Sequence, residues 1–157
     1  SQEIQRLIGR SLRGILDFTK MPERTIVIDC DVLQADGGTR TASITGAYVA
    51  LKIAVDKMLR EGSLKQNPLT DGIAAISVGI KNESILVDLN YEEDSTADID
   101  MNLVMTHGGK ILEIQGTGEN TSFSPNQLMQ MVVAGQEALS GSFELQQLAA
   151  DGQEVES

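Results

Sequence analysis

Cysteine, positive charge and long apolar runs are all scarce in this sequence of 157 residues. The single cysteine, Cys30, excludes an internal disulfide and fits a reducing compartment. A catalytic thiolate would need a histidine beside it, and the only histidine, His107, stands in a turn sequence with no evident relation to Cys30. We therefore discard thiol catalysis and expect Cys30, which lies in an apolar stretch, to be a core residue.

Lysine and arginine number 12 against 23 aspartates and glutamates, which gives a net charge of −11. This balance argues against the chain coating a nucleic-acid backbone by itself, because such binding depends on cations that neutralise phosphates. The charge is uneven, however: basic residues gather in the first 24 positions, and acidic ones crowd between Asp88 and Asp100 and at the C-terminal end. Where an acidic cluster lies near a phosphate site, a cation is usually needed between the carboxylates and the phosphate.

The apolar runs, such as residues 73–78 with Ser77 in their middle, are far too short to span a bilayer, and no basic-then-apolar signal pattern opens the chain. We expect a cytoplasmic protein that does not meet a membrane. The hydrophobic fraction of 41% and the charged fraction of 22% are typical of one soluble domain with a core. This domain is predicted to cover residues 1–145, followed by a disordered, acidic polar tail over residues 146–157.

Apolar periodicity predicts the order of the elements. A 3.6-residue period indicates helices over residues 2–17, 39–60 and 125–148, the last with Ser124 as its N-cap. Alternation predicts a strand over residues 24–33 and four more over residues 72–80, 84–91, 98–106 and 110–117. The four later strands resemble an antiparallel meander. We therefore expect an α+β fold in which helices cover one face of a mostly antiparallel sheet.

A glycine junction precedes the second predicted helix and is suited to holding an anion. Gly37 and Gly38 let a ligand approach the backbone, and the first turn of a helix presents free N–H groups and the positive end of its dipole. Arg40 adds a cation at a position that the dipole disfavours unless an anion is bound, and the hydroxyl of Ser43 lies one turn further on. A purely structural helix start, with Thr39 at the N-cap, is the alternative.

Carboxylates and amides crowd residues 88–102. Strand alternation places Asp98, Asp100 and Asn102 on one face, opposite the apolar face. Aspartates on the same face repel one another unless Mg²⁺ or Mn²⁺ lies between them, or unless one has a raised pKa and acts as a general acid. A solvated edge strand is the structural alternative.

Several of these stretches together resemble bacterial RNase PH, the tRNA nucleotidyltransferase family. They are IQRLI at residues 4–8, ADGGTRTASITGA at residues 35–47, Glu93-Asp94-Ser95, Asp100-Met101-Asn102 and EIQGT at residues 113–117. The similarity extends from Ser1 to about Gln136, and the run at residues 35–47 is highly specific.

The resemblance implies an RNase PH-like fold, of the ribosomal protein S5 domain 2-like type, and a phosphate-dependent 3′→5′ exoribonuclease. Such an enzyme uses inorganic phosphate to cleave the 3′ end of tRNA precursors, releases nucleoside diphosphates and is assisted by Mg²⁺ or Mn²⁺. Residue by residue, Thr39 and Arg40 match the phosphate-binding pair, with Gly38 and Ser43 as further contacts. Asp94 and Asp100 match the catalytic, metal-associated aspartates, and which of them protonates the departing oxygen stays open.

Family members carry an N-terminal portion that this sequence does not show, with several strands, a basic RNA-gripping loop and an arginine that completes the phosphate site. We therefore expect a chain whose fold is incomplete at the N-terminus, and which is inactive or weakly active alone. The family also implies a homo-oligomer, a hexamer built as a trimer of dimers. The alternative is a catalytically silent, RNA-binding or ring-forming subunit of the exosome or polynucleotide phosphorylase type.

Overall fold

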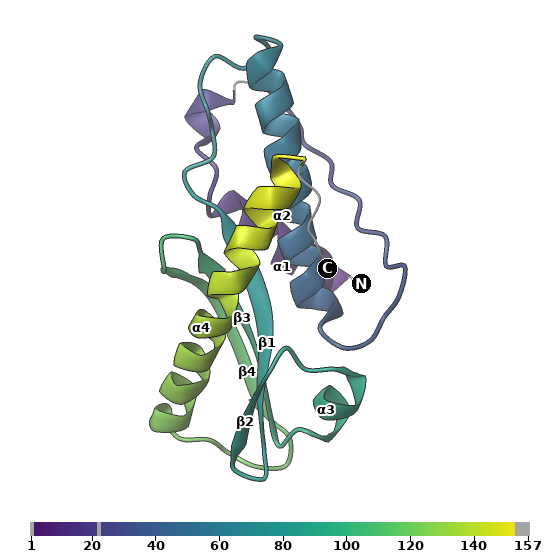
Figure 1. Ribbon diagram of the computed structural model, residues 1–157, viewed down its shortest axis with the longest axis vertical. Coiled ribbons are helices and arrows are strands. Elements are labelled where there is room, and N and C mark those ends of the chain that lie inside the picture. The colour runs from purple at the N-terminus through teal and green to yellow at the C-terminus, as the bar shows by residue number, and fades with distance from the viewer. Residues whose placement is uncertain (1, 22, 153–157) are drawn as a thin grey trace.

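The computed structural model describes residues 2–21 and 23–152 and has an α+β architecture, as predicted (Figure 1). None of the helices in these residues is long and apolar enough to cross a membrane. The elements, in chain order, are α1 (Gln2–Arg13), the 3-10 turn η1 (Phe18–Lys20), α2 (Thr39–Arg60), β1 (Ile73–Lys81), β2 (Ser84–Val87), α3 (Tyr91–Thr96), β3 (Ile99–Thr106), β4 (Ile111–Gly118) and α4 (Pro125–Ala150).

The strands form one antiparallel sheet in the order β2-β1-β3-β4. The predicted meander is wrong in one connection, because β3 pairs with β1, from Ile73 opposite Thr106 to Ile80 opposite Ile99, and not with β2. β1 is buried along nearly its whole length, so its backbone N–H and C=O groups need hydrogen-bond partners within the protein. The strands on its two sides supply them. The connection through α3 carries the chain from one edge of β1 to the other.

Helices pack on both faces of the sheet, where one covered face was predicted. Ile73 and Ala75 of β1 belong to a hydrophobic cluster with α1 and α2, whereas Ile76 and Val78 belong to a second cluster with Met131 of α4. Successive side chains of a strand point to opposite faces, and β1 is apolar or small at successive positions. Such a strand requires cover on both sides.

α2 begins and ends where the sequence predicted. It follows Gly37 and Gly38, whose φ angles are 72° and 58°, and it stops before Gly62, whose φ of 74° continues the chain in the left-handed region. Its buried stripe includes Ile44 and Leu51, which anchor the helix to the sheet.

The strand predicted over residues 24–33 is absent. The segment has no regular secondary structure and pairs with no strand in the described part of the chain, and Val27 and Leu33 are exposed. Ile26 and Ile28 pack against the cluster of α1 and α2, which explains the alternation in the sequence. Cys30 is exposed, so its prediction as a core residue is wrong; a strand face is buried only where a neighbouring layer covers it.

α4 extends further than predicted. It starts with Ser124 in a capping box with Gln127, as expected for this sequence, but runs to Ala150. The first residues of the predicted disordered tail are therefore helical. Gln146 explains this difference, because it is buried and its amide donates to the backbone carbonyls of Ile73 (2.8 Å) and Thr45 (3.1 Å). Residues 151–152 form a turn, and residues 153–157 of that predicted tail lie outside the described residues.

Candidate active site

The glycine junction packs directly against the segment that carries Asp94. A Cβ atom on Gly37 would lie 2.5 Å from the carbonyl oxygen of Leu89 and 2.6 Å from the carbonyl carbon of Asn90, so only glycine fits this approach. The backbone N–H of Tyr91 also points to the Asp36 carboxylate, at 3.4 Å. The start of α2 and the start of α3 are thereby fixed side by side.

The first turn of α2 keeps its N–H groups available. Gly38 is the N-cap and has no side chain with which to cap the helix. The hydroxyl of Thr41 donates to the Gly38 carbonyl (2.9 Å), and among the described residues no N-cap side chain bonds to the N–H groups of the turn. Free N–H groups at a helix start suit an anion, and the phosphate site stays a prediction.

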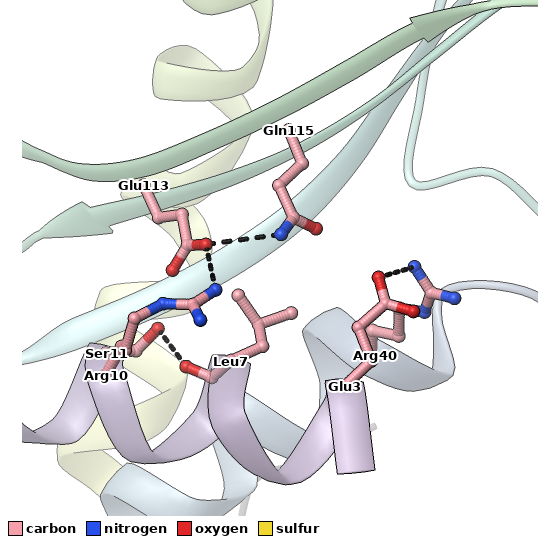
Figure 2. A network of polar contacts seen from close by, with 7 residues as sticks. All are labelled: Glu3, Leu7, Arg10, Ser11, Arg40, Glu113 and Gln115. Atoms are coloured by element: carbon pink, nitrogen blue, oxygen red, sulfur yellow. Dashed lines mark hydrogen bonds and ion pairs between the residues drawn. The ribbon is translucent and has the colours of Figure 1, made fainter. Parts of the chain in front are cut away.

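Ser43 and Arg40, the other predicted phosphate ligands, interact with different groups in the structure. Ser43 donates its hydroxyl hydrogen back to the Thr39 carbonyl (2.7 Å), so its oxygen is turned along the helix. Arg40 projects from the first turn of α2 and forms an ion pair with Glu3 of α1, with 3.6 Å between Nη1 and Oε1 (Figure 2).

Asp94 lies on α3, a short helix in the stretch between the strands predicted over residues 84–91 and 98–106. β2 stops at Val87 because Asp88 takes a φ of 59°, and Asn90 then caps α3 by accepting from the N–H of Glu93 (2.9 Å). Asp94 is exposed in the first turn of this helix. The Asn90–Glu93 capping box was the sequence signal that could have predicted α3.

Asp100 lies in β3, between Gly79 of β1 and Thr117 of β4, on the polar face predicted from strand alternation. It is half-buried, and its Oδ1 is buried with no hydrogen-bond partner among the described residues. Burial raises the pKa of Asp100, and the negative charges of Asp94 and Glu119 raise it further, while the Arg40 cation opposes them. The predicted aspartates and the predicted arginine thus share one electrostatic environment.

Two acidic residues near Asp100 differ from the sequence analysis. Asp98 has another role than expected, and Glu119 was missed. Asp98 was grouped with Asp100, but its carboxylate accepts from the backbone N–H of Asn82 (3.1 Å) and supports the β1–β2 turn. Glu119 was not singled out, although its charge acts on Asp100. The register of β3 and β4 places it there, because Gly118 pairs with Ile99 and the N–H of Glu119 donates to the Asp98 carbonyl (2.9 Å).

The carboxylates fit a shared Mg²⁺ ion better than an all-protein metal cage. Within residues 2–21 and 23–152, no group of three or more His, Cys, Asp or Glu side chains is placed to hold a metal. Mg²⁺ in phosphate-transferring sites is commonly held by one or two carboxylates together with substrate phosphates and water. The unpartnered Oδ1 of Asp100, with Asp94 nearby, matches that donor set.

Comparison with protein families decides the relationship. The model of the 3′ exoribonuclease family, domain 1, matches residues 1–55, and the model of its domain 2 matches residues 71–138. The chain belongs to the 3′ exoribonuclease family. The resemblance stated from the sequence motifs is confirmed.

Similar curated proteins place this exoribonuclease-family chain more narrowly. Ribonuclease PH of Bacillus pumilus is 54% identical over 157 residues, which are 99% of this chain and 64% of the relative. Ribonuclease PH of Bacillus subtilis is 61% identical over 129 residues, covering 82% of this chain and 53% of the relative. The chain therefore spans between half and two thirds of the length of these relatives.

A solved structure supports the fold of the exoribonuclease-family chain. Rice Rrp46 superposes with a TM-score of 0.76 at 19% sequence identity, over 95% of this chain and 64% of the rice chain. At this identity the likeness concerns the fold alone, and it agrees with the RNase PH-like architecture predicted above.

Proposed function

We propose that this chain carries the phosphate site and the catalytic aspartates of a phosphorolytic 3′→5′ exoribonuclease of the ribonuclease PH type. The observation that carries the proposal is the packing of the α2 glycine junction against α3, which brings Arg40 and a ready anion site into the electrostatic environment of Asp94 and Asp100. The substrate is the 3′ end of RNA, with tRNA precursors as the expected class.

In the proposed reaction, an oxygen of inorganic phosphate attacks the phosphorus of the terminal phosphodiester. The bond from that phosphorus to the preceding 3′ oxygen breaks, and a nucleoside 5′-diphosphate leaves. The N–H groups of the first turn of α2, with Thr39 and Arg40, would orient the attacking phosphate. The departing 3′ oxygen takes a proton, which one of the two aspartates would supply.

Asp94 and Asp100 would hold the Mg²⁺ or Mn²⁺ ion. When bound, the ion supplies positive charge to the scissile phosphate.

We expect the enzyme to be a homo-oligomer, a hexamer arranged as a trimer of dimers. The exposed apolar side chains of Met129 and Val133 on α4, beside Ile85 of β2, are consistent with such subunit contacts.

The test is an assay for diphosphate release. The chain is incubated with 3′-extended tRNA, phosphate and Mg²⁺, with and without the part of the Bacillus subtilis relative that the chain does not cover, supplied as a separate polypeptide. We expect nucleoside diphosphates only when phosphate is present, and much more of them with the added polypeptide. D94N and D100N should each lower the rate by about 100-fold or more.

D98N is the matched control, because Asp98 supports a turn and should leave the rate within about twofold of the wild type. Nucleoside monophosphates released without phosphate would contradict the proposal. RNA binding without any diphosphate, even with the added polypeptide, would instead favour the silent-subunit alternative.

A further inference from the structure

Arg40 forms an ion pair with a carboxylate of the same chain, Glu3. Its Nη1 lies 3.6 Å from Oε1 of Glu3, and the two side chains come from the first turns of α2 and α1 (Figure 2). Both remain accessible, with 44% of the Arg40 side chain and 65% of the Glu3 side chain exposed. The partner of the predicted phosphate ligand is therefore an anion that solvent and solutes can reach.

A second ion pair, between Arg10 of α1 and Glu113 of β4, shows how a carboxylate with two hydrogen-bond donors is held in this structure. Arg10 donates to Oε1 of Glu113 at 2.6 Å, and Gln115 donates to the same oxygen at 3.2 Å (Figure 2). Among the described residues Glu3 has no such second partner, and its contact with Arg40 is longer. A guanidinium presents five N–H donors, so one carboxylate oxygen at 3.6 Å leaves most of the fork unused.

We propose that Glu3 competes with inorganic phosphate for Arg40, and that phosphate displaces Glu3 when it binds. This inference rests on the proposed function. A cation in the first turn of a helix is disfavoured by the helix dipole, and a nearby anion offsets that effect. Glu3 fills this role in the unliganded protein and lowers the apparent phosphate affinity, because binding must first break the ion pair. Glu3 thereby sets the phosphate concentration at which the site fills.

The test compares phosphate binding by E3Q, E61Q, R40Q and the wild type, using isothermal titration calorimetry on the 157-residue chain at low ionic strength. E61Q is the matched control: Glu61 forms an exposed ion pair with Lys57 just past the other end of α2 (3.8 Å), so it changes the net charge equally at a distant place. We expect the Kd for phosphate to fall by about two- to fivefold in E3Q and to stay unchanged in E61Q.

The difference between E3Q and the wild type should shrink as salt is raised, since salt screens the exposed pair. If R40Q loses binding while E3Q binds no more tightly than E61Q, the competition is refuted and the phosphate site stands. If the wild type and E3Q bind no better than R40Q, the phosphate site itself is refuted. Thermal unfolding of each variant verifies that it is folded.

Discussion

The carboxyl group of Asp100 is partly buried, so its ionisation costs free energy in the folded state. Substitution of this residue can measure that cost. The pKa of Asp100 is raised mainly by burial and secondly by the charge of Asp94, so the folded state binds this proton more tightly than the unfolded chain does. The free energy of unfolding therefore decreases as pH rises from the ordinary aspartate range through the raised pKa. At pH values above the raised pKa of Asp100, the folded protein bears the cost of the ionised side chain.

D100N should consequently be more stable than the wild type at pH 7 in metal-free buffer. We expect a rise in Tm of about 2–4 °C, roughly 1 kcal/mol, because the amide has the same shape and no charge. The gain should disappear at pH values below the ordinary aspartate pKa, where both side chains are neutral. Calorimetric scans between low and neutral pH measure this, with D98N as a control that should show no gain. A lower Tm of D100N at pH 7 would refute the account.

The candidate site residues named from the sequence are those at which chemistry and spacing pointed the same way, and their roles stay predictions. Arg40 was singled out because a cation opposes the dipole of the helix that it starts, and Asp100 because strand alternation separates it from apolar neighbours. Glu3 and Glu119 were not, since their relation to the site depends on how α1 and β4 pack. Tertiary packing between distant segments leaves no local trace in the sequence.

At the scale of elements, the contact between the glycine junction and α3 holds the two halves of the proposed site together. G37A places a Cβ at a φ of 72° and within 2.5 Å of the Leu89 carbonyl oxygen. We expect a loss of roughly 2–4 kcal/mol in the free energy of unfolding, from backbone strain plus the displacement of α3. Amide hydrogen exchange in α3 should accelerate accordingly. Urea denaturation and exchange measurements test both parts.

G62A isolates the strain. Gly62 has nearly the same φ, 74°, but a Cβ there meets nothing within 4 Å. Its cost should be about 1 kcal/mol, with hydrogen exchange in α3 unchanged. If G37A and G62A lower the free energy of unfolding equally, the close approach to Leu89 contributes nothing to stability.

The elements that the sequence predicted are those with strong local signals. α2 and α4 have glycine or capping-box boundaries, and β1, β3 and β4 have clear alternation or turns. The segment 24–33 alternates just as clearly, yet it is not a strand, because a strand also needs a neighbour with which to pair. α3 was missed because its six residues are too few for a helical period.

At the scale of the whole molecule, one sheet joins two hydrophobic clusters. Its strand order and its second covered face could not be predicted from the sequence, because apolar residues at successive positions of β1 do not reveal which helix covers which side. β1 and β3 contribute side chains to both clusters, so loosening one face disturbs strands that the other face requires. We therefore expect the domain to unfold as one cooperative unit.

M131A tests this from the α4 face, where Met131 is fully buried, while Tyr48 reports from the α2 face. The chain has no tryptophan and two tyrosines, so Y91F, which changes an exposed side chain, leaves Tyr48 as the single fluorophore of that type. In that background M131A should lower the free energy of unfolding by about 2–5 kcal/mol, equally by far-UV circular dichroism and by Tyr48 fluorescence. L145A, on the same helix but 50% exposed, should stay within about 0.5 kcal/mol. A Tyr48 transition that M131A leaves in place would mean that the two faces unfold independently.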